Sequence, residues 1–77
     1  MQIVLFVTDA CSMCDEALDM VFESDQLSGH ILDVVDIMSD AELFNRLAQK
    51  IPVAQIGDYE LDWPFTDQQI AELANSE

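Results

Sequence analysis

The amino-acid sequence predicts a single α/β domain over residues 1–77, with a mixed sheet and helices available for both of its faces. Three observations support this prediction: an apolar run at the N-terminus, segments of helical period that alternate with short β-branched runs, and a hairpin signal in the last third. The element order is β-α-β-α-β-β-α. A strand–helix–strand unit implies a right-handed crossover and a parallel strand pair, whereas the terminal hairpin implies an antiparallel pair.

The first strand and the first helix are marked by a change of hydrophobic period. Residues 2–8 (QIVLFVT) form a short β-branched and aromatic run, which is typical of a strand buried on both faces. Apolar side chains then recur at helical spacing and predict one buried helix face: Cys14, Ala17, Leu18, Val21 and Phe22. Residues 24–29 (SDQLSG) are turn formers that end this helix.

A second strand and a second helix follow. Residues 30–37 (HILDVVDI) predict a strand, and the carboxylates of Asp33 and Asp36 favour an edge position, where charge discourages edge-to-edge association. Ser39 and Glu42 have the spacing of a capping box, which predicts the start of a helix over the apolar residues that follow.

A hairpin and a third helix complete the chain. Residues 51–63 contain Gly57-Asp58, which fits a two-residue turn of type II′ and is followed by alternating apolar and polar residues. Thr66 and Gln69 repeat the capping-box pattern and predict the start of the last helix.

The charge balance is strongly acidic, because 16 acidic residues face two cations and give a formal net charge of −14. Such a surface repels nucleic acid and anionic membranes, and it favours a partner with a basic face. The alternative is that the charge only keeps a small apolar protein soluble. The two cations, Arg46 and Lys50, suit the negative dipole end of the second helix. No apolar stretch approaches the ~20 residues of a membrane span, and no signal segment is visible, so we expect a soluble cytoplasmic monomer.

Two cysteines in the stretch VTDACSMCDEA carry the chemistry of the sequence. Cys11 falls in the loop after the first strand, and Cys14 falls one turn into the first helix. The amides at a helix N-terminus favour a thiolate at Cys11, which can attack a disulfide, while Cys14 resolves the mixed disulfide. A C-x-x-C pair beside a βαβ pattern therefore indicates a thiol–disulfide site.

Two other interpretations of these cysteines stay open. Cys14 fits the apolar stripe of its helix and could be a small buried hydrophobe. Zinc would need four ligands, and Cys11, Cys14 and His30 provide three, so we expect no metal site. Neighbouring carboxylates disfavour a strongly stabilised thiolate, which predicts a reducing dithiol protein and not an oxidant.

The motifs CSMC after the first strand, KIPV before the third and ELDWPF after the hairpin carry a family resemblance. Over nearly its whole length the chain resembles the thioredoxin fold in its minimal glutaredoxin form, and more narrowly a family of small bacterial glutaredoxin-like proteins. The resemblance implies a four-stranded mixed sheet flanked by three helices. It also implies that Cys11 is the nucleophile, that Cys14 is the resolving thiol, and that Pro52 is a cis-proline which presents the backbone of Ile51 to a substrate.

The sequence departs from the family pattern at several positions around the motif. Ser12 and Met13 replace the usual Pro-Tyr, an acidic stretch replaces a basic residue before the cysteines, and Trp63-Pro64 replaces a Gly-Gly pair. Lys50 stands where the family has a basic residue near the cis-proline. We expect no cofactor, since these departures argue against glutathione binding in the family's mode.

We predict six substrate contacts beside the cysteines: Ser12, Met13, Lys50, Ile51, Pro52 and Trp63. Met13 either contacts an apolar substrate or fills space against Trp63. The predicted function is a glutaredoxin-like thiol–disulfide oxidoreductase that acts on a protein disulfide with a basic face. The alternative is a non-enzymatic adaptor that binds through its acidic surface, and a glutathione-held iron–sulfur cluster is a third, minor hypothesis.

Overall fold

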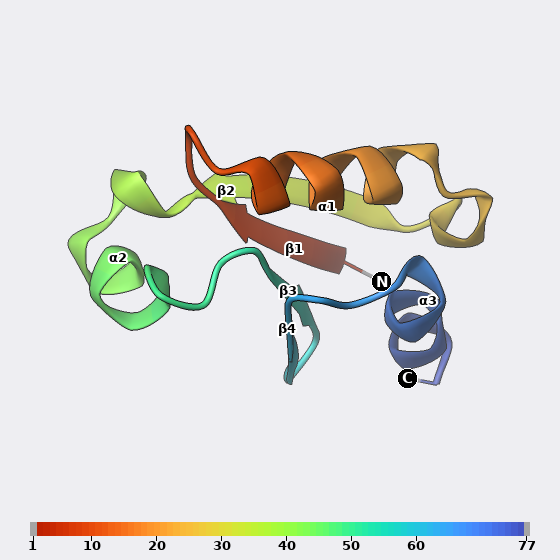
Figure 1. Cartoon of the computed structure of the whole chain (residues 1–77). Helices are drawn as coiled ribbons and strands as arrows, with labels where there is room; N and C mark the ends of the chain where they lie inside the picture. The colour runs from red at the N-terminus through yellow and green to blue at the C-terminus, as the bar shows by residue number, and fades with distance from the viewer. Residues whose placement is uncertain (1, 77) are drawn as a thin grey trace.

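The computed structural model describes residues 2–76 and contains four strands, three α-helices and two short 3₁₀ turns (Figure 1). In chain order these are β1 (Gln2–Val7), α1 (Ser12–Glu23), η1 (Asp25–Leu27), β2 (Ile31–Asp36), η2 (Ile37–Ser39), α2 (Ala41–Leu47), β3 (Val53–Ile56), β4 (Tyr59–Asp62) and α3 (Asp67–Asn75). This order of strands and helices confirms the predicted one. Within the described residues, no helix has both the length and the apolarity to cross a membrane.

The four strands form one mixed sheet in the order β2-β1-β3-β4. β1 runs parallel to β2, from Gln2 opposite Ile31 to Val7 opposite Asp36, and antiparallel to β3. β3 and β4 form the predicted hairpin. Gly57 has a φ of +59° at the first position of the hairpin turn, as a primed turn requires. β1 is therefore central, and β2 lies at one edge.

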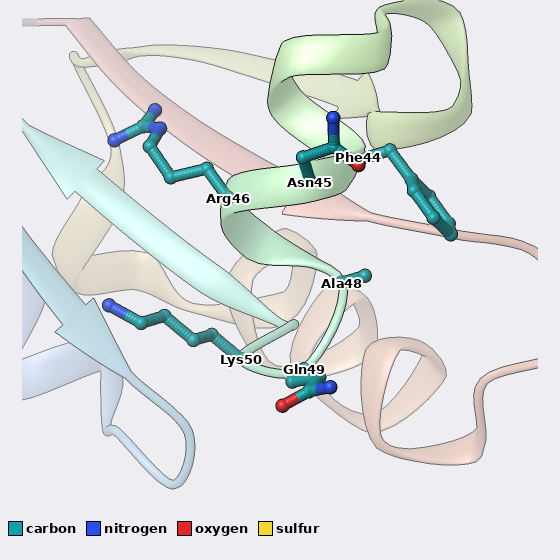
Figure 2. A pocket seen from close by; sticks show the side chains of 6 residues that line it. All are labelled: Phe44, Asn45, Arg46, Ala48, Gln49 and Lys50. Carbon is teal, nitrogen blue, oxygen red and sulfur yellow. The ribbon is translucent and has the colours of Figure 1, made fainter.

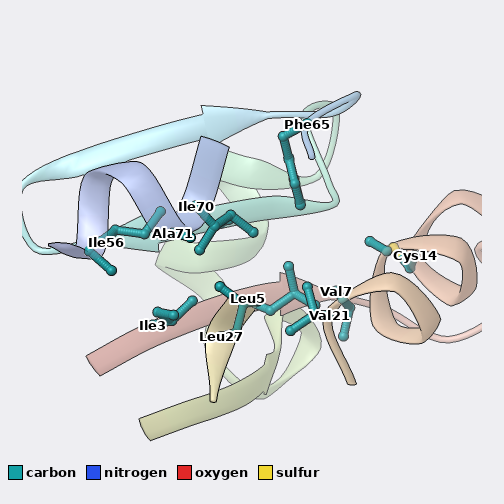
Figure 3. Packing of buried hydrophobic residues seen from close by; sticks show 13 residues of the cluster. Ile3, Leu5, Val7, Cys14, Val21, Leu27, Ile56, Phe65, Ile70 and Ala71 are labelled. Carbon is teal, nitrogen blue, oxygen red and sulfur yellow. The ribbon is translucent and has the colours of Figure 1, made fainter. Parts of the chain in front are cut away.

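The core has two parts because helices cover both faces of the sheet. On one face α1 and α3 pack over the larger cluster, which includes Ile3, Leu5 and Val7 of β1 (Figure 3). On the other face α2 covers a smaller cluster that includes Phe6 of β1. Alternate residues of β1 thus point into opposite clusters, which explains why its sequence is a continuous apolar run.

Phe22 departs from the predicted buried face of α1. The buried stripe of this helix consists of Cys14, Ala17 and Val21, whereas Phe22 is 66% exposed. Phe22 lies about 100° around the helix from Val21, since an α-helix has about 3.6 residues per turn. It therefore falls beyond the margin of the stripe that the sheet covers.

The start of α2 corrects a second prediction. Asp40, and not Ser39, is the N-cap residue, because its carboxylate accepts hydrogen bonds from the amides of Glu42 and Leu43 at 2.8 and 3.3 Å. The Ser39 hydroxyl instead donates to the Asp36 carbonyl at 2.7 Å. Both residue types are good caps, so their sequence order alone did not decide between them.

The capping box at the start of α3 is confirmed. The Gln69 amide donates to the Thr66 hydroxyl at 3.1 Å, and the Gln69 side chain accepts from the Thr66 amide at 2.8 Å. The two bonds satisfy amides at a helix end that have no partner within the helix.

Candidate functional site

The nucleophile candidate caps the first helix. Cys11 is the N-cap residue of α1, and its Sγ accepts a hydrogen bond from the Cys14 backbone amide at 3.1 Å. Ala10, directly before it, has a φ of +55°, in the left-handed region, at the end of the loop from β1. A sulfur at this position lies at the helix N-terminus, where the amides of the first turn leave a partial positive charge.

Cys14 lies in a different environment, although it is in the first turn of the same helix. Its side chain is 0% exposed and belongs to the cluster beneath α1 and α3 (Figure 3). Burial away from water, and then a hydrogen bond with the Cys11 side chain, raise the pKa of Cys14 to about 11. At neutral pH Cys14 is therefore a protonated thiol, adjacent to a partly exposed partner.

The chain directly before β3 contains the residues that the family resemblance implies for substrate binding. The Ile51–Pro52 peptide bond is cis, as the family resemblance implied, and Pro52 is fully buried. The Ile51 amide donates to the Leu47 carbonyl at 3.1 Å, and that carbonyl also accepts from the Lys50 amide at 2.8 Å. Outside the regular elements of residues 2–76, no backbone hydrogen bond ends at the Ile51 carbonyl. The Ile51 carbonyl oxygen is therefore available to accept a hydrogen bond.

Three partly exposed side chains pack against the same core cluster. Cys11, Ile51 and Trp63 all pack against the cluster that contains Cys14. Trp63 also contacts Phe65 edge to face, with ring centroids 5.1 Å apart, and Phe65 is itself in the core. The fold thus brings a sulfur, an apolar side chain and an indole ring to the margin of one cluster.

The two residues between the cysteines are exposed. Met13 is 47% exposed and belongs to neither core cluster, and Ser12 is exposed as well. Both side chains are accessible to a molecule that approaches Cys11.

Lys50 lines the same hollow as Arg46. Both cations line a hollow of about 540 Å³ at the end of α2, together with Phe44, Asn45, Ala48 and Gln49 (Figure 2). Arg46 also forms an ion pair with Glu60 of β4, at 3.2 Å. Arg46 is in the last turn of α2 and Lys50 is in the turn that follows, so their closeness in sequence already places the two cations near each other.

Carboxylates surround the cysteine motif. Asp9, Asp15 and Glu16 are all exposed, and the charge of Asp15 adds to the raised pKa of Cys14. In the described part of the chain, no three His, Cys, Asp or Glu side chains are grouped so that they could hold a metal ion. His30 instead lies against α3, with its Nε2 3.2 Å from the Asn75 Oδ1.

The comparison with known families settles the family of this chain. The sequence profile of the glutaredoxin-like domain (DUF836) matches residues 2–74. The chain belongs to this glutaredoxin-like family. A search among curated proteins finds no match. Among solved structures, the X-ray structure of the structural genomics target protein XcR50 from X. campestris is similar, with 26% sequence identity, 97% coverage of both chains and a TM-score of 0.76. The fold is thus the minimal, glutaredoxin-like form of the thioredoxin fold.

Proposed function

We propose that this glutaredoxin-like protein is a thiol–disulfide oxidoreductase that reduces a disulfide in a protein substrate. The observation that carries the proposal is the asymmetry of the two sulfurs. Cys11 is partly exposed at the helix N-cap, and Cys14 is fully buried and hydrogen-bonded to it. This is the arrangement that an attacking thiolate and an internal resolving thiol require.

The reaction has two exchange steps. The Cys11 thiolate attacks one sulfur of the substrate disulfide, a new S–S bond forms, and the second substrate sulfur leaves as a thiolate. Cys14 then attacks the Cys11 Sγ, its proton passes to the departing substrate thiolate, and a Cys11–Cys14 disulfide remains. Two electrons move to the substrate, and an external thiol or dithiol reductant returns the pair to the reduced form. No resident cofactor is needed, and the reducing cytoplasm suits this cycle.

The proposed substrate groove lies beside Cys11. The Ile51 carbonyl can accept a hydrogen bond from an extended substrate segment, and Pro52 supports that backbone from the core. Ser12, Met13 and Trp63 provide polar and apolar contacts around the reacting sulfur. The exposed carboxylates near the motif favour a substrate with basic residues around its disulfide. Lys50 contributes from the end of α2, where it can meet an acidic group of the same substrate.

A pair of matched variants tests this proposal. Cys14→Ser keeps the attacking sulfur and removes the resolving thiol, so it accumulates a mixed disulfide with an oxidised basic peptide. Cys11→Ser keeps the buried thiol and forms no adduct, since Cys14 is inaccessible. Intact-protein mass spectrometry measures both adducts, and the wild type reduces the same peptide in the presence of dithiothreitol. Equal amounts of adduct in the two variants would reject the proposed chemistry. It would also be rejected if neither variant formed an adduct and the wild type did not reduce the peptide.

A further inference from the structure

The edge strand β2 is a second functional candidate, remote from the thiol chemistry. Four of its six side chains are exposed: Ile31 is 65% and Val34 is 43% exposed, and Asp33 and Asp36 are exposed as well. Only one side of its backbone is paired, since β1 is its single neighbour in the sheet (Figure 1). A strand that exposes its backbone edge and large β-branched residues is a template for another strand.

A second copy of this chain does not fit this edge. Self-association at this edge would join two chains that each carry a net charge of −14, with the Asp33 and Asp36 carboxylates of both copies along the new strand pair. Like charges across a strand pair are destabilising, and charges on an edge strand are a common protection against self-association. The Asp33 carboxylate accepts a hydrogen bond from the Gln2 side chain of β1, and its negative charge, together with that of Asp36, disfavours a like edge and favours a partner of opposite charge.

The two faces of β2 have the same composition. Alternation along the strand places Ile31 and Asp33 on one face and Val34 and Asp36 on the other. Each face thus offers one exposed apolar side chain and one exposed carboxylate two residues further along, while Leu32 and Val35 pack against the two core clusters. We propose that β2 binds an extended, basic segment of another protein as a fifth strand, with Lys or Arg opposite Asp33 and Asp36 and β-branched residues opposite Ile31 and Val34.

The location of the surface is defined by the strand register. Asp36 is opposite Val7, the last residue of β1, and the loop to Cys11 begins there. One end of a segment bound along β2 therefore lies at the same end of the strands as the loop that leads to Cys11. Its binding uses backbone hydrogen bonds and the four side chains of β2, and it does not depend on either cysteine.

A peptide titration tests this inference. The probe is a capped hexapeptide, Lys-Thr-Val-Lys-Thr-Ile, which in antiparallel register places its lysines opposite Asp36 and Asp33. Amide shifts of the ¹⁵N-labelled protein are expected to be largest in β2 and to remain in a Cys11→Ser/Cys14→Ser variant. Raising the salt from about 0.02 M to about 0.3 M weakens binding several-fold, because the Debye length shortens.

The controls separate local complementarity from net charge. Asp33→Lys is expected to weaken the binding of the lysine peptide about tenfold. The same variant is expected to gain binding of a peptide in which glutamate replaces both lysines. Asp58→Lys makes the same charge change in the hairpin turn and should weaken the binding of the lysine peptide less than twofold. Equal effects of the two variants, equal binding of both peptides by the wild type, or absence of shifts in β2 would overturn the inference. None of these results bears on the cysteine chemistry, which the mixed-disulfide variants test separately.

Discussion

Cys11 and Cys14 belong to one helical turn but occupy opposite environments. Cys11 is the N-cap residue, where its sulfur accepts an amide hydrogen bond at 3.1 Å and remains partly exposed. Cys14 is 0% exposed in the main core cluster. The difference arises from their places in the helix, since a cap side chain folds back over the first turn while the third helical residue here faces the sheet.

This comparison shows how one residue type acquires two chemical roles. The Cys11 sulfur lies among backbone amides at the helix N-terminus, whereas the core disfavours negative charge on Cys14 and raises its pKa to about 11. An attacking sulfur benefits from the first environment. A resolving thiol benefits from the second, because it stays protonated and unreactive until a mixed disulfide forms next to it.

The largest expected difference between the two positions is in alkylation rate. At pH 8 a thiol with a pKa of about 11 is ionised in roughly one molecule in 1000, and burial also excludes the reagent. We expect iodoacetamide to modify Cys11 at least roughly 100-fold faster than Cys14 in the native, reduced protein, because Cys14 is both protonated and buried. Peptide mapping by mass spectrometry measures both rates, and in denaturant the two should be similar. Similar rates in the native protein would contradict the buried, protonated state of Cys14.

The second prediction concerns stability at alkaline pH. The folded-state pKa of Cys14, about 11, lies above its ordinary value of 9.0. Between these values the unfolded chain releases the proton and the folded chain retains it, so the free energy of unfolding falls as pH rises. The loss begins near pH 9, is complete above pH 11, and reaches at most about 3 kcal/mol.

Urea unfolding of the reduced protein at a series of pH values measures this loss. Cys14→Ala is the matched control, because it lacks the titrating group and keeps all the other residues that ionise in this range. The wild type should lose more stability than the variant between pH 9 and 11. Parallel pH profiles for the two proteins would show that the Cys14 thiol is not the group responsible.

Part of this asymmetry follows from sequence. Hydrophobic period and cysteine spacing are local signals, and they correctly predicted the element order, a Cys11 position before the helix and a Cys14 position one turn into it. Phe22 could not be predicted as exposed, since the width of the buried stripe depends on how far the sheet extends beneath α1. The ion pair between Arg46 and Glu60 of β4 depends on how α2 is oriented on the sheet. These features are set by tertiary packing, which a single segment does not encode.

The smallest predicted effect concerns the structural role of the Cys11 sulfur. Replacing an N-cap side chain with alanine typically costs about 1 kcal/mol, because an amide of the first turn loses its acceptor. We expect Cys11→Ala to lower the free energy of unfolding by about 1 kcal/mol and Cys11→Ser to lower it by less, since the serine hydroxyl also accepts the Cys14 amide. Urea unfolding of the reduced proteins at pH 7 measures both changes. Equal losses in the two variants would mean that the sulfur contributes through packing against the core, and the cap contribution would then be rejected.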